Sequence, residues 1–218
     1  MAKSKRKTIE LEICRLLAAR LAGAGYTYRA DPEVNIFTRR DGQSSWSFSF
    51  HLWGSGPYHF IDSVWVSYDA HFAVLRDLLA RTAEADDSAA FGGPSDHVSN
   101  YWAEQNSRTI ASLADVPEFT NDFLSALSRA TEQFLVPHSD TKEVANRCTL
   151  FYTKWPRSMG PINTAFYLIA HGIQQSDRPA IQLGIDRIDQ RIDFCRTDGE
   201  RAFALMIRKA AMVDLAGQ

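Results

Sequence analysis

The feature that most constrains this fold is a change in hydrophobic periodicity. Three segments between residues 33 and 68, EVNIFTRR, SSWSFSFHLW and YHFIDSVWVSY, alternate apolar and polar residues with a period of two. A period of two is typical of strands with one buried face. Asp41-Gly42 and Gly54-Ser55-Gly56-Pro57 separate the segments and have the composition of turns. The sequence therefore predicts a three-stranded antiparallel meander.

The register of this meander follows from its apolar positions. The even positions of the middle segment form one apolar face: Trp46, Phe48, Phe50 and Leu52. Pairing even with even positions adds these residues to that face: Val34, Ile36, Thr38, Tyr58, Phe60, Val64 and Val66. This choice predicts hairpin loops of three or five residues. The core is expected under this face, with a first helix over residues 8–22 packed on it.

Helical signals dominate the rest of the chain. Asp69 is expected to cap a helix over residues 70–82, and residues 83–100 have the composition of a linker. Residues 101–114 (YWAEQNSRTIASLA) and the remainder up to 215 are predicted to be helical. Residues typical of helix starts support this prediction, and these are Asp115 with Glu118, Asp140 with Glu143, Pro161, Pro179, and Thr197 with Glu200.

The predicted class is thus α+β, with a helix and meander over residues 1–82, a linker over 83–100 and an all-helical region over 101–218. The two parts either form one domain or are separate units. A meander of three strands is only marginally stable alone, which favours packing with the later helices.

Composition narrows the function. The 218 residues carry a net charge of −2, so no strong overall field attracts nucleic acid or acidic lipid. No stretch approaches the roughly 18 apolar residues of a membrane span, and charged residues interrupt the first apolar run. Cys14, Cys148 and Cys195 are too widely spaced for a zinc or redox motif. We expect a cytoplasmic protein with buried free thiols, no membrane contact and no nucleic-acid partner.

The segment HLWGSGPYHFID contains two histidines that could belong to a site. His51 and His59 are predicted on the sheet face opposite the core, close enough for both to bind a metal. A third ligand is needed, and the nearest candidate, Asp62, is predicted to point to the other face. Asp62 itself interrupts the apolar face. It is either a buried carboxylate with a raised pKa or a residue that a β-bulge turns outward.

Aromatic residues near the same turn indicate a binding surface. Trp53, Tyr58, Trp65 and Tyr68 give the sheet edge an aromatic character, and His51 and His59 lie among them. The alternative is that the C-terminal helices bury these side chains.

Other polar clusters are interpreted as structural. Asp186, Asp189 and Asp193 share a helix face with arginines, which favours a salt-bridged surface over a divalent-ion site. His171, with Asn163 and Tyr167, is expected on a polar helix side, at the surface or at an interdomain contact. Phosphate-loop, dinucleotide, GxSxG and HExxH motifs do not occur, so no cofactor is expected.

The order of elements resembles that of a loose group of uncharacterised bacterial α+β proteins. The resemblance rests on GYTYRADPEVNIFTRR leading into the meander and on NYWAEQN leading into helices, and it covers about two thirds of the chain. Such domains look like accessory or immunity-type proteins of bacterial conflict loci.

The resulting hypothesis is a non-enzymatic cytosolic protein that binds another protein, with an immunity-type toxin inhibitor as one form. One alternative is a metal-dependent hydrolase or nucleic-acid-processing enzyme using His51 and His59. Another is a structural subunit of a homo-oligomer.

Overall fold

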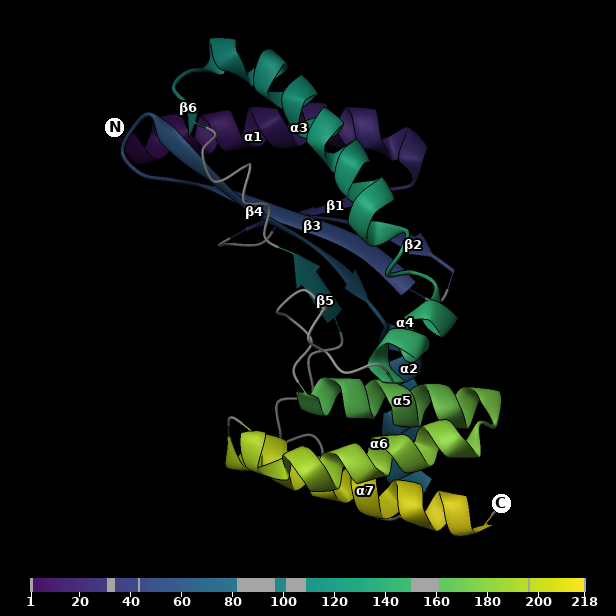
Figure 1. Cartoon of the computed structure of the whole chain (residues 1–218). Helices are drawn as coiled ribbons and strands as arrows, with labels where there is room; N and C mark the ends of the chain where they lie inside the picture. The colour runs from purple at the N-terminus through teal and green to yellow at the C-terminus, as the bar shows by residue number, and fades with distance from the viewer. Residues whose placement is uncertain are drawn as a thin grey trace. The chain divides into compact units, whose positions relative to one another are not determined.

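The chain divides into two compact units. The computed structural model describes residues 2–30, 34–42, 44–81, 97–100, 109–149, 161–195 and 197–217 (Figure 1). The first unit, here the sheet unit, is Met1–Val66 with Ser99–Ser139, and the second, the helical unit, is Ser67–Val98 with Asp140–Gln218. The α+β class is confirmed. The division does not follow the expected order of domains, because each unit takes residues from both sides of 83–100.

The sheet is larger than the predicted meander. Its described strands are β1 (Thr27–Ala30), β2 (Asn35–Asp41), β3 (Ser44–Trp53), β4 (Tyr58–Ser67), β5 (His97–Asn100) and β6 (Thr109–Ile110). The order is β1-β2-β3-β4-β5, and β6 pairs with β4. The β2-β3-β4 meander is therefore confirmed in an enlarged sheet. β5 lies within the predicted linker, and β6 lies where a helix was predicted over residues 101–114, so the C-terminal half is not all helical.

The register predicted for the first hairpin is wrong by one residue. Phe37 pairs with Phe48, and Asp41 pairs with Ser44, so the connection has two residues instead of three or five. Gly42 has a φ of 58°, which suits a tight two-residue turn. The physical reason lies in the aromatic face. Phe37 is fully buried and stacks on Phe48 at a centroid distance of 4.8 Å, while Ile36 is only half-buried.

The predicted face of the other two strands is confirmed. Phe50 stacks on Phe60 at 4.9 Å. On the opposite face, the hydroxyls of Ser49 and Ser63 lie 3.2 Å apart. The even residues of β3 and β4 are buried, and these are Ser44, Trp46, Phe48, Phe50, Leu52, Tyr58, Phe60, Asp62, Val64 and Val66.

Two helices cover this buried face of the sheet. Figure 1 shows α1 (Ala2–Leu21) and α3 (Val116–Ala130) on the same side of the strands. Phe123 of α3 packs against Phe48 at 5.3 Å and against Phe60 at 5.4 Å. Helix α1 starts earlier than predicted, continues into a 3-10 turn (Ala22–Ala24), and ends at Gly25 with a φ of 81°. A π-helical turn (Thr131–Leu135) extends α3.

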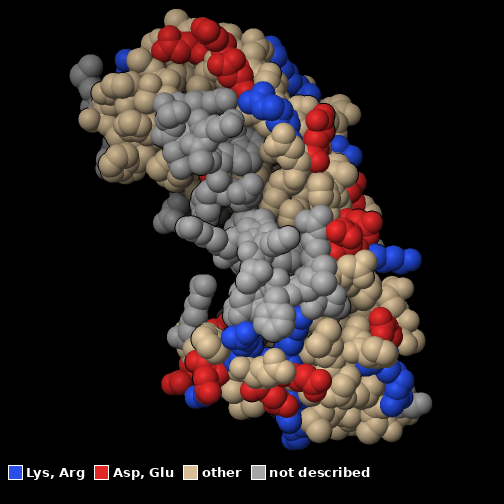
Figure 2. All heavy atoms as spheres, in the orientation of Figure 1, with Lys and Arg blue, Asp and Glu red and all other residues tan. Residues whose placement is uncertain are grey.

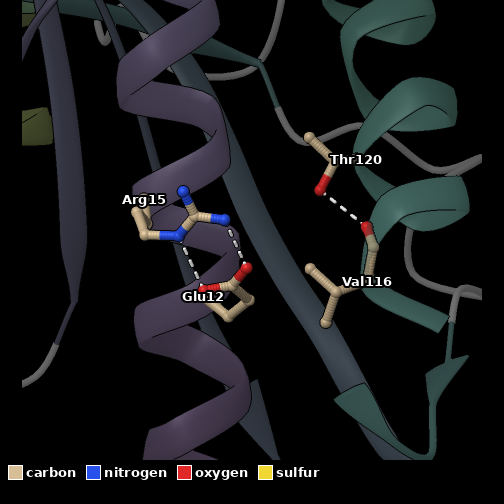
Figure 3. Close-up of polar contacts among 4 residues, drawn as sticks. All are labelled: Glu12, Arg15, Val116 and Thr120. Carbon is tan, nitrogen blue, oxygen red and sulfur yellow. Dashed lines mark hydrogen bonds and ion pairs between the residues drawn. The ribbon is translucent and has the colours of Figure 1, made fainter. Parts of the chain in front are cut away.

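Two buried polar side chains in the sheet unit have partners, one in a neighbouring element and one in the same helix. The carboxylate of Glu10, buried in α1, accepts a hydrogen bond of 2.8 Å from the backbone N–H of Leu52 near the end of β3. Thr120 is fully buried in α3, and its hydroxyl donates to the carbonyl of Val116 at 2.7 Å (Figure 3). Each contact satisfies a group that would otherwise be costly to bury.

The predicted capping box at the start of α3 is displaced by one turn. Asp115 does not cap α3 with Glu118. Its carboxylate instead accepts hydrogen bonds from the N–H groups of Ala111 and Ser112, in the 3-10 turn Leu113–Asp115. These hydrogen bonds, that from the Ser112 hydroxyl foremost, lower the pKa of Asp115. Ser112 is the N-cap of this 3-10 turn, and it forms a reciprocal capping box with Asp115.

The helical unit is built around α5. Its elements are α2 (Asp69–Arg81), α4 (Thr141–Thr149), α5 (Pro161–Gln175), α6 (Arg178–Arg191), a 3-10 turn (Ile192–Phe194) and α7 (Asp198–Gly217). Helix α5 packs against α2, α4 and α6, and every residue from 162 to 172 is buried. Figure 1 shows α5, α6 and α7 as successive layers. Because helices enclose α5 on several sides, it has no polar outer face.

Two glycines allow α5 and α6 to pack closely. A Cβ on Gly184 of α6 would lie 2.6 Å from Ile169 and 2.9 Å from the carbonyl oxygen of Ala165. A Cβ on Gly172 of α5 would lie 2.6 Å from Ile181. Each glycine therefore occupies a position where the facing helix leaves no room for a side chain.

Several predicted helix starts in the helical unit are confirmed. Asp140 accepts hydrogen bonds from the N–H groups of Lys142 and Glu143, and Thr197 accepts one from the N–H of Glu200. Helix α5 begins at Pro161, as expected. Val213, near the end of α7, is 59% exposed.

Candidate functional sites

The β3–β4 hairpin ends in an exposed aromatic residue. Trp53 is 61% exposed at the end of β3, and its ring lies 6.4 Å from that of the exposed His59 on β4. Residues 54–57 form the exposed turn between them. Gly54 and Gly56 have positive φ values there. Trp53 and His59 thus form an accessible pair, here called the hairpin tip.

The other predicted aromatic binding residues lie deeper. Tyr58 is only 3% exposed, because it begins the strand β4 and pairs with Ile110 of β6. Tyr68 is fully buried in the helical unit, with its ring 5.1 Å from that of Tyr167. Trp65 is half-buried. Tyr58 and Tyr68 are therefore interior residues, which corrects their expected place on an exposed surface.

The two hairpin histidines have no ligand set around them in the described part of the chain. His51 is half-buried and His59 is exposed. Asp62 is 4% exposed on the opposite face, so this side chain is buried and no bulge turns it outward. Across residues 2–30, 34–42, 44–81 and the later described ranges, no three His, Cys, Asp or Glu are grouped to hold a metal ion.

A second candidate is a cluster of rings in the interior of the helical unit. His71 of α2 lies against Tyr167 and His171 of α5, at centroid distances of 4.8 and 5.9 Å and interplanar angles of 9° and 6°. Tyr167 and His171 are one helical turn apart and 6.3 Å from each other. The three nearly parallel rings are here called the histidine stack.

The nitrogen atoms of the histidine stack are short of hydrogen-bond partners. His71 is fully buried, and neither Nδ1 nor Nε2 of its ring has a partner; Nδ1 of the 7%-exposed His171 has none either. Burial and, to a smaller extent, the neighbouring His171 together lower the pKa of His71 to about 4. Burial also lowers the pKa of His171, against the opposing effect of Asp177. Both imidazoles are therefore neutral at pH 7.

This arrangement corrects the expected position of His171. With Asn163 and Tyr167 it was predicted on a polar helix side, yet all three are buried. Periodicity did not reveal the stack, because His71 and His171 are 100 residues apart. The signal that the sequence does contain lies within α5, where Asn163, Tyr167 and His171 recur at every fourth position among apolar residues.

The acidic face of α6 is structural, as predicted. Asp189 binds Arg208 of α7 through two hydrogen bonds, and Asp193 pairs with Arg201. Figure 2 shows acidic and basic side chains side by side on the pictured face of each unit. Exposed pairs of this kind contribute little stability, about 0–1 kcal/mol each.

The three cysteines are free thiols. Cys14 and Cys148 are buried, as predicted, and burial raises their pKa to about 11 and about 12. Cys195 is half-buried and its pKa is also raised by burial. A thiol with a raised pKa is a weak nucleophile at neutral pH.

Comparison with known proteins yields no relative. No protein-family model matches the chain, and neither the curated proteins nor the solved structures contain a match. None of the described helices is long and apolar enough to cross a membrane.

Proposed function

We propose that this protein is a non-enzymatic cytosolic binding protein that recognises another protein through the hairpin tip. The main observation in support of this proposal is that Trp53, at the end of strand β3, is 61% exposed. Tryptophan is the residue type that most often dominates a protein interface, because one rigid side chain buries a large area and its indole N–H can donate a hydrogen bond.

The support beneath the hairpin tip favours such a role. Tyr58 is buried directly after the turn, and both it and His59 are paired with β6. A side chain on paired strands loses less conformational freedom on binding than one on a free loop. The immunity-type inhibitor of a toxin is the form that the resemblance to bacterial conflict proteins suggests.

The test is a binding comparison of matched variants. The tagged full chain is used to isolate a partner from its host, and the dissociation constant of the purified pair is measured. Trp53→Ala should weaken binding at least about 30-fold, since a hot spot contributes about 2 kcal/mol or more. The matched control is Phe194→Ala, an aromatic residue of the helical unit that is 62% exposed. Equal affinity of Trp53→Ala and the unaltered chain would remove the hairpin tip from the interface.

One observation favours a second function, a structural subunit of a homo-oligomer. Leu205, Met212 and Val213 of α7 are 48%, 46% and 59% exposed. Three large exposed apolar side chains on one helix are a common feature of interfaces between subunits. Sedimentation equilibrium checks this: Leu205→Lys should then lower the mass to that of a single chain. A single-chain mass for the unaltered protein would contradict it.

A further inference from the structure

The histidine stack has no part in the proposed binding surface, yet its geometry is unusual. Two imidazoles lie 5.9 Å apart in the packed contact of α2 with α5. A proton on His71 would place a positive charge in the interior with no acceptor for either N–H group. A second proton on His171 would add a like charge beside it. The present packing therefore fits two neutral rings and opposes charged ones.

We propose that the contact between α2 and α5 is an acid-sensitive latch, closed while His71 and His171 are neutral and opened when they bind protons. The latch holds α2 through the ring contacts and through the side-chain amide of Gln174, which donates to the carbonyl of Ala70 at 3.2 Å. Opening exposes the rings to water, where an imidazolium is well solvated.

The charged groups around the stack do not offset this effect. On α5 the neighbours of His71 are His171 and the neutral Tyr167, and the phenol ring of Tyr68 lies edge-on to His71 at 6.5 Å. Asp177, at the start of α6, favours a charged His171, whereas Lys142 of α4 disfavours it. On α7, which also packs on α2, Asp214 is paired with Arg81 at 3.5 Å, ten residues along α2 from His71.

The direction of the pH effect follows from the two states of His71. In the open state its pKa is the ordinary 6.5, and in the closed state burial lowers this pKa to about 4. The open state therefore binds the proton more tightly, and the closed state loses its advantage as the pH falls from 6.5 towards 4. Between pH 7.5 and pH 5 the opening equilibrium of α2 should rise about 30-fold from His71 alone.

Hydrogen exchange of the full chain tests the latch. Protection factors are measured at pH 7.5 and pH 5.0 and corrected for the intrinsic effect of pH on exchange. Peptides from α2 should lose about 30-fold in protection. Peptides from β3, in the sheet unit, should lose much less. A change in α2 no larger than that in β3 would overturn the proposal.

Variants show whether His71 is the sensor. His71→Phe and His71→Leu keep an apolar side chain at the position and remove the titrating group. Either variant, once folded, should lose most of the pH effect on α2, and the control His59→Phe should retain it. If neither folds, the ring protons of His71 are titrated in the unaltered chain by NMR. A midpoint near 6.5 with α2 still protected contradicts the latch.

Discussion

The two units differ in what surrounds a buried polar side chain. In the sheet unit, helices cover one face of the strands, and the carboxylate of Glu10 in α1 accepts a hydrogen bond from the backbone N–H of Leu52 in β3. In the helical unit, α5 is enclosed by α2, α4 and α6. There His71 and His171 pack by ring contact, while ring nitrogens remain without hydrogen bonds.

This difference shows which helices and strands can be predicted from the sequence. An element with one buried face carries a periodic apolar pattern, so β3 and β4 were predictable. An element buried on several sides carries a nearly continuous apolar run, and its polar residues are then found in the interior. His171 is an example, because it lies on α5 among residues that are all buried.

The largest expected effect concerns the register of the sheet unit. Phe37→Ala should reduce the free energy of unfolding by about 3–5 kcal/mol, because the ring is fully buried against Phe48 and Phe50. Ile36→Ala should cost only about 1 kcal/mol, since Ile36 is half-buried. Urea denaturation measures both. The reverse order of the two effects would contradict the observed register.

The close contact in the helical unit should be nearly as sensitive. Gly184→Ala should cost about 3 kcal/mol, because its Cβ would meet the carbonyl oxygen of Ala165 at 2.9 Å and force α5 and α6 apart. Gly23→Ala is the control, since no atom lies within 4 Å of its Cβ, and it should change stability by less than about 1 kcal/mol. Thermal and urea unfolding both report this; equal effects at the two glycines would rule out the close contact.

Loss of the hydrogen bond between Glu10 of α1 and Leu52 of β3 should have a smaller effect on stability. Glu10→Ala should cost about 2 kcal/mol, because it leaves the buried N–H of Leu52 without an acceptor. Glu10→Gln retains an acceptor oxygen and should cost less. Glu12→Ala removes only the exposed ion pair with Arg15 (Figure 3) and should leave the free energy of unfolding nearly unchanged. Equal stabilities of the Glu10→Ala and Glu12→Ala variants would show that the hydrogen bond between Glu10 and Leu52 does not stabilise the fold.

The smallest effect is expected at the hairpin tip. Trp53→Ala should change the free energy of unfolding by no more than about 0.5 kcal/mol, because the side chain is 61% exposed. Tyr58→Ala, at the other side of the same turn, should cost about 3 kcal/mol, since Tyr58 is buried. Comparable losses from the two variants would show that Trp53 supports the fold, and the binding comparison would then lose its value.

Local sequence patterns predicted much of the fold, whereas they predicted the candidate sites only in part. Asp140 and Thr197 cap their helices where the residue types predicted. The tip residue Trp53 is exposed, but Tyr58, five residues on, is buried because β6 pairs beside it. The local sequence does not predict β6, because this short strand depends on pairing with β4, about 50 residues away in the chain.

By itself, the sequence determined the α+β class, the meander of β2, β3 and β4, and the starts of most later helices. These features depend on the spacing of apolar residues and on residues that cap backbone groups nearby in the chain. Tertiary structure alone decided the remaining features. The aromatic stack on Phe37 selected the register, the close packing of α5 on α6 required Gly184, and α2 brought His71 onto His171. Each of these depends on contacts between residues distant in sequence, whose cost and benefit no short window of residues contains.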